Sequence, residues 1–405
     1  MNRLLARKKS SSSLCSKQSE ASSVSPSSAT PSDQKPREVK NALYQDARYK
    51  TILASIGSFL DESDLGITSN SKDDLQTLLA AEQPLPVNTL FRDDLFKLAY
   101  RKIQDRNKTR VIRDISLLIV PSAEILATYG ATHLEYLIES SNDGWNNSIP
   151  LTKTRPQPDY SVGFRREAFT EDQLKRLEPF VGDLSDTSFF MATYYMYFPF
   201  LTCEVKCGAA ALDVADRQNA HSMTLAVRGI VELFRLLNRE RELHREILGF
   251  SISHDHRTVR IYGHYPIIDG VKTTFYRHPI HTFDFTALEG KEKWTAYKFT
   301  KNVYDIWMPS HLKRICSVID DLPPDLNFEV SEKAEPLESG LSQGLESQNL
   351  SDYSSHDAAS LLEETGSQSS RVSSRDVTPD TSLSQRMGRA SKKLKKRARP
   401  EELHQ

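Results

Sequence analysis

The chain has 405 residues, and its 53 Lys and Arg are balanced by 54 Asp and Glu, which gives a formal net charge of -1. This balance excludes a protein that binds nucleic acid through overall positive charge, although it leaves room for a local basic segment. The four cysteines form no closely spaced set for a disulfide framework, so we expect a reducing compartment. The longest apolar run is too short to span a bilayer and no secretory signal stands out, so we expect neither a membrane protein nor a secreted one.

Composition divides the chain into four parts. Residues 1–39 are rich in Ser and poor in apolar residues, so they are predicted to be a disordered leader. Residues 40–90 carry apolar residues at helical spacing and are predicted to form a helical N-terminal arm. Residues 91–323 contain enough aromatic and aliphatic residues for one sizeable core. Residues 324–405 return to a Ser-, Gln- and Glu-rich composition, which predicts a disordered tail.

The predicted tail ends in a dense basic cluster. Such clusters on accessible chain ends are typical of nuclear localisation signals, and the other interpretation is a general polyanion-binding segment. We therefore expect a nuclear protein, and otherwise a cytoplasmic one. The residues that would bind a nuclear import receptor are Lys392, Lys393, Lys395, Lys396 and Arg397.

The first chemically distinctive segment is a short strand that begins at Asp159. Asp159, Ser161 and Gly163 alternate with the larger apolar residues Tyr160, Val162 and Phe164, which predicts a strand with one apolar face. The proline at position 158 is tolerated at the start of a strand. The Asp159 carboxylate is therefore expected at a strand end, on the face opposite the apolar packing.

A second predicted strand, over residues 198–206, carries an acid and a base in an apolar setting. Side chains alternate across a strand, so Glu204 and Lys206 share one face while Cys203 and Val205 share the other. A buried ion pair contributes little to stability compared with apolar residues, which favours a functional role. The alternative is a structural salt bridge beneath the neighbouring helices.

Pro-Asp followed by Glu-x-Lys at the end of an apolar strand resembles the metal-binding signature of the PD-(D/E)XK nuclease-like superfamily. Both short strings recur elsewhere in the chain, but only in segments that cannot supply a buried strand, such as 289–291 and 324–325. Over about residues 40–322 the chain also resembles a fungal domain-of-unknown-function family that is regarded as a divergent relative of that superfamily. The resemblance implies an α/β fold with a restriction-endonuclease-like core, in which helices flank a central mixed sheet of about four strands.

The resemblance also implies roles for individual residues. Asp159 and Glu204 match the metal ligands, and Lys206 matches the catalytic lysine. Cores of this type commonly place a glutamate on their first helix. Residues 123–140 are predicted to be helical, so the candidates are Glu139 and Glu135, with Glu124 behind them, and we take Glu139 as the metal ligand. Gln218, on the helix that follows the Glu204 strand, is expected to help by hydrogen bonding.

A hairpin is predicted downstream, with strands over residues 247–253 and 258–265. Its second strand places Arg260, Tyr262 and His264 on one face, where they could border a phosphate backbone.

The expected activity is hydrolysis of phosphodiester bonds in DNA or RNA. This reaction needs an activated water and neutralisation of charge in the transition state, and Mg²⁺ held by two carboxylates supplies both. The alternative is a catalytically inactive module of the same fold that binds nucleic acid or a protein partner, or that serves as a nuclear scaffold.

Overall fold

The computed structural model describes residues 4–8, 43–208 and 211–323, all within one compact unit. Most of the predicted disordered leader, the whole predicted tail and its basic cluster lie outside the described residues. Residues 4–8 pack on the unit, because Leu4 is buried and the short strand β1 (Arg7–Lys8) pairs with β4 (Asp186–Thr187). The prediction that the arm ends at residue 90 stays a prediction.

A mixed sheet of six strands forms the centre of the unit, in the order β2-β3-β5-β6-β7-β8. Only β5 and β6 run parallel, and the other neighbours in this sheet are antiparallel. This arrangement confirms the predicted α/β class with a mixed sheet flanked by helices. The strands are β2 (Leu137–Ser140), β3 (Tyr160–Phe164), β5 (Tyr197–Val205), β6 (Gly249–His254), β7 (Thr258–Asp269) and β8 (Lys272–Asp284).

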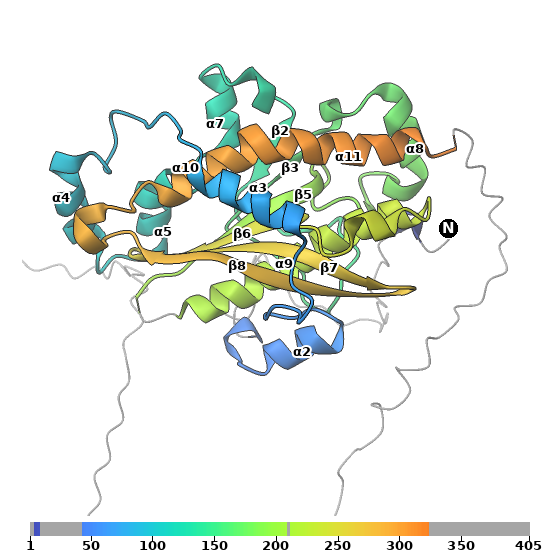
Figure 1. Ribbon diagram of the computed structural model, residues 1–405, viewed down its shortest axis with the longest axis horizontal. Helices are drawn as coiled ribbons and strands as arrows, with labels where there is room; N and C mark the ends of the chain where they lie inside the picture. The colour runs from blue at the N-terminus through green and yellow to red at the C-terminus, as the bar shows by residue number, and fades with distance from the viewer. Residues whose placement is uncertain (1–3, 9–42, 209–210, 324–405) are drawn as a thin grey trace, which may run out of the picture. The chain divides into compact units, whose positions relative to one another are not determined.

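One face of the sheet is covered by a nearly continuous helical run near the end of the described chain (Figure 1). This run consists of α10 (Thr295–Asn302), the π-helical segment η7 (Val303–Trp307) and α11 (Met308–Asp320). Phe250 of β6 packs edge-to-face against Phe299 and Trp307, which fixes the run on the sheet.

The long helix α9 (Leu212–Arg235) covers the other face and contacts β5, β6 and β7. The short helix α2 (Tyr49–Ser55) lies against α9, at the bottom of Figure 1. The layer between α9 and the sheet is polar as well as apolar. Asn219 of α9 accepts a hydrogen bond from Thr202 and donates two, to the Ile252 carbonyl and to Ser253. Polar strand residues on this face are therefore satisfied by the helix above them.

The remaining helical segments surround the sheet. In chain order they are α3 (Ser69–Ala80), α4 (Asp93–Ile103), α5 (Lys108–Val111), η2 (Ile112–Ser116), α6 (Leu117–Ile119), α7 (Ala123–Thr128), η3 (Thr132–Leu134), η4 (Arg166–Ala168), α8 (Glu171–Val181), η5 (Glu240–Leu243) and η6 (Ala287–Gly290). Among the described residues, no helix is both long and apolar enough to cross a membrane.

The predicted helix over residues 123–140 is wrong. Helix α7 ends at Thr128, the chain turns at Gly130 with a φ of +105°, and residues Leu137–Ser140 form strand β2. Gly tolerates this left-handed conformation, so the helix stops there although the apolar spacing continues. Glu139 is thus a strand residue rather than a helix residue.

Candidate functional site

Asp159 lies where the sequence analysis expected it, at the residue before β3. The antiparallel register pairs Tyr160 with Cys203 and Ser161 with Thr202, so the next position brings Asp159 opposite Glu204. The Val205 backbone N–H donates a hydrogen bond of 2.8 Å to Oδ2 of Asp159. This bond fixes the carboxylate at the end of β5.

Glu204 and Lys206 project from the end of β5 toward α9. Both side chains are buried, with Glu204 only 1% exposed. Lys206 Nζ lies 3.3 Å from Oε2 of Glu204 and 2.5 Å from Oε1 of Gln218, which comes from α9. The structure therefore brings Asp159, Glu204, Lys206 and Gln218 together from two strands and a helix.

The two carboxylates interact strongly. Burial and the neighbouring Asp159 charge together raise the pKa of Glu204 to about 8, against a partial opposing effect of Lys206 and Lys108. Asp159 is close enough to share a hydrogen bond with Glu204. Two adjacent carboxylates with little solvent around them favour a shared proton or a shared cation.

Lys108 belongs to the same cluster and was missed by the sequence analysis. Its Nζ lies 2.5 Å from Oδ2 of Asp159. Lys108 is the first residue of α5, and the side chain of Asn107 caps this helix by accepting from the Arg110 N–H. The cap signal could have located the helix start, but nothing in the sequence indicates that this helix meets the Asp159 strand.

Glu139 does not join the cluster. It pairs in register with Val162, whereas its neighbour Ser140 pairs with Ser161 on the α9 face, so Glu139 points to the opposite face of the sheet. Its carboxylate accepts hydrogen bonds from Ser122 Oγ and from the Tyr160 hydroxyl, both at 2.8 Å.

His254 ends β6 beside the cluster and is fully buried. Its Nδ1 donates to the Asp255 carbonyl at 2.9 Å, so its Nε2 accepts from Ser116 Oγ at 3.0 Å. Burial lowers the pKa of the imidazole, which keeps it neutral. Both ring nitrogens are occupied by these bonds, so His254 acts as a support for the end of β6.

The donor set fits a hard cation bound by few protein ligands. Within the part of the chain that the structure describes, no group of three or more His, Cys, Asp or Glu is arranged to hold a metal ion. Structural zinc sites need four protein ligands, whereas Mg²⁺ is commonly held by one or two carboxylates together with water and substrate phosphates. The number of carboxylates here, Asp159 and Glu204, matches the second kind of site and not the first.

The hairpin residues form a separate network beside the start of α9. Arg260 donates to Asp216 at 2.7 Å and to Asp213 at 2.8 Å, and the Tyr262 hydroxyl donates to Asp216 at 3.1 Å. The guanidinium and the hydroxyl are thus directed at carboxylates of α9. They do not form an open basic face in this structure, as a contact with a phosphate backbone would require.

A comparison with protein-family models matches residues 95–319 to a domain of unknown function, DUF7924. The chain belongs to the DUF7924 family. The DUF7924 domain contains Lys108, Asp159, Glu204, Lys206 and Gln218, whereas α2 and α3 precede it. No curated protein matches the chain. The relationship of the DUF7924 family to PD-(D/E)XK nucleases and its fungal origin stay predictions.

Proposed function

We propose that this protein is a Mg²⁺-dependent phosphodiesterase of the PD-(D/E)XK type that cleaves DNA or RNA. One observation carries the proposal. The carboxylate of the buried Glu204 and that of Asp159, whose side chain is 8% exposed, lie opposite each other at the ends of paired strands, beside Lys206 and Gln218. Buried charged groups are costly, and a stable core does not require two carboxylates and a lysine at one strand end.

Each residue has a distinct role in this proposal. Asp159 and Glu204 hold the cation, and Mg²⁺ when bound would neutralise the scissile phosphate and lower the pKa of a water. Lys206 is fixed by Glu204 and Gln218, so its ammonium is positioned to orient the attacking water or to stabilise developing negative charge. Gln218 positions Lys206 through its side-chain carbonyl oxygen.

Metal binding is the first test. Isothermal titration calorimetry should show that Mn²⁺ binds the wild-type protein. We expect the affinity to fall at least about tenfold in Asp159→Asn and in Glu204→Gln, because each change removes a carboxylate ligand without changing the side-chain volume. Glu139→Gln is the matched control, since this carboxylate lies on the opposite face of the sheet. No Mn²⁺ binding by the wild type would rule out the proposed activity.

Cleavage is the second test. With Mg²⁺ present, single- and double-stranded DNA and RNA substrates should be cut by the wild type and by Glu139→Gln, but more slowly by a factor of at least about 100 in Lys206→Met, since one positioned charge-stabilising group typically contributes this much. Equal cleavage by wild type and Lys206→Met would remove Lys206 from the mechanism.

The second candidate function is a non-catalytic binding module of the same fold. The observation in its favour is that each carboxylate already has a lysine partner, Lys108 for Asp159 and Lys206 for Glu204. Such a module would bind nucleic acid or a protein partner without binding Mn²⁺ through Asp159.

We also propose that the protein is nuclear and is imported through the cluster Lys392, Lys393, Lys395, Lys396 and Arg397. Support comes from the sequence alone, because these residues lie outside the described ranges. A fluorescent fusion of the full chain should lose nuclear enrichment when the four lysines are replaced by alanine.

A further inference from the structure

We propose that Lys108 is an exchangeable internal cation: it neutralises Asp159 when no divalent metal is bound, and it binds a phosphate of the substrate strand once a metal has displaced it. This inference rests on the proposed function, because it concerns the same pair of carboxylates.

The two lysines of the site differ in how firmly they are held. The Lys206 side chain is 9% exposed and contacts both Glu204 and Gln218. The Lys108 side chain is 35% exposed, and its ammonium contacts Asp159. The Lys108 ammonium can therefore rotate into solvent once another cation neutralises Asp159, whereas the Lys206 ammonium is held inside the protein.

The Lys108 ammonium occupies space that a metal bound to Asp159 would need. Its Nζ lies 2.5 Å from Oδ2, the same oxygen that accepts from the Val205 N–H. A divalent cation coordinated at this carboxylate would repel an ammonium only a few ångströms away. The metal and the Lys108 ammonium therefore compete for Asp159.

The displaced ammonium would stay at the rim of the site. Lys108 begins α5, so its backbone is fixed by the helix and only the side chain is free to move. A phosphodiester backbone that enters the site brings further phosphates beside the one being cleaved. The freed ammonium is a compact point charge of the kind that pairs with such phosphates.

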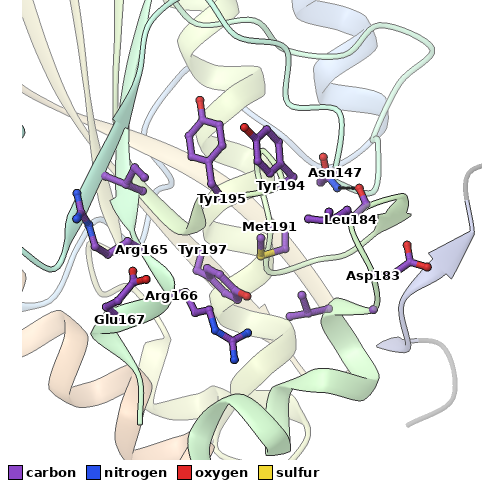
Figure 2. Close-up of a pocket in the computed structure, with 13 residues that line it drawn as sticks. Asn147, Arg165, Arg166, Glu167, Asp183, Leu184, Met191, Tyr194, Tyr195 and Tyr197 are labelled. Atoms are coloured by element: carbon purple, nitrogen blue, oxygen red, sulfur yellow. Dashed lines mark hydrogen bonds between the residues drawn. The ribbon is translucent and has the colours of Figure 1, made fainter. Parts of the chain in front are cut away.

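A large surface cavity elsewhere in the described chain gives weaker grounds for a ligand site. The cavity of Figure 2, about 600 Å³ in volume, is lined by Tyr194, Tyr195, Tyr197, Arg165 and Arg166, among others. Arg165 already donates to the Leu137 carbonyl and pairs with Glu124, and Arg166 lies near Glu171. These charges are balanced within the protein, so the cavity does not define the charge of a ligand.

The experiment is a titration of the full-length, metal-free protein with Mn²⁺ in the absence of nucleic acid. Lys108→Met removes the charge and keeps most of the side-chain length, so we expect Mn²⁺ to bind roughly tenfold or more tightly than to wild type. Lys108→Arg keeps a positive charge at this position and should stay close to wild type. Lys102→Met, an exposed lysine on the preceding helix, is the matched control and should not change the affinity. Circular dichroism of the same samples confirms that each variant is folded.

A second measurement tests the phosphate contact. With Mn²⁺ present, Lys108→Met should bind an oligonucleotide more weakly than wild type. The slope of the logarithm of affinity against the logarithm of salt concentration should decrease by the amount that about one phosphate contact contributes. Unchanged Mn²⁺ affinity in Lys108→Met, with normal binding by wild type, overturns the inference and leaves the proposed function intact. Binding by both proteins, but roughly tenfold or more tightly by Lys108→Met, supports the inference. Absence of Mn²⁺ binding in both proteins overturns the inference and the proposed function together.

Discussion

At the scale of single residues, Glu204 links the site to the stability of the fold. Its pKa rises from 4.5 to about 8 on folding, because of burial and the neighbouring Asp159 charge. The folded state therefore binds more protons than the unfolded state between these two pH values. The free energy of unfolding must then decrease as pH increases through this window, by up to about 1.4 kcal/mol per pH unit from this group.

Replacing Glu204 by Gln removes this titration, so the first expectation is a flatter pH profile. From pH 5 to pH 8 the unfolding free energy of the wild type should decrease more than that of Glu204→Gln. Urea denaturation of both proteins, with chelator present, measures it. Two profiles that run parallel over this range would show that Glu204 is ionised normally.

The site also shows which residues a sequence can predict. Asp159, Glu204 and Lys206 follow from strand alternation, a local rule that needs only the neighbouring residues. Gln218 can be predicted because it lies on the helix that directly follows this strand in the chain. Lys108 precedes Asp159 by a long stretch of intervening chain, and only the tertiary packing of α5 brings them into contact.

At the scale of elements, two strands were harder to predict than the helices. Strand β2 lies in a stretch whose apolar residues also fit a helix. The turn at Gly130 is what ends helix α7 and allows the following residues to form a strand. Strand β8 carries many polar residues between the buried Phe275 and Phe283 and contains Pro279, features that hide a strand in a sequence. Both strands lie at the edges of the sheet, where solvent satisfies polar groups and proline is tolerated.

The contact between α9 and the chain before β5 gives an element-scale prediction. Gly229 lies within α9, where alanine would ordinarily stabilise a helix by up to about 1 kcal/mol. A Cβ at this position would lie 2.5 Å from the backbone oxygen of Phe189, which cannot move aside by rotating a side chain. Gly229→Ala should therefore destabilise the fold by about 1–3 kcal/mol. An increase in the thermal midpoint would show that α9 can shift away from this segment.

At the scale of the whole molecule, the N-terminal arm lies outside the family domain but packs on its longest helix. The matched domain begins at residue 95, yet Tyr44 and Leu53 are buried against α9 with Ala220. Arg217 of α9 donates to the Tyr44 carbonyl at 2.7 Å. Burial, together with the neighbouring Tyr49 and more weakly the Glu204 charge, raises the pKa of the Tyr44 hydroxyl. This part of the arm thus packs on the turn of α9 that also carries Gln218.

Helix α2 packs in a small apolar cluster with Ala220 of α9, apart from the main core that holds Leu75 and Leu78 of α3. We therefore expect α2 to open without unfolding of the sheet. Leu53→Asp places a charge at a fully buried position of α2 and should release this helix. Hydrogen exchange should then accelerate in Tyr49–Ser55 while β5 stays protected. Ile52→Asp is the matched control, because the adjacent Ile52 is 45% exposed and should leave exchange unchanged. Loss of protection in β5 together with α2 would instead show that α2 opens only when the sheet unfolds.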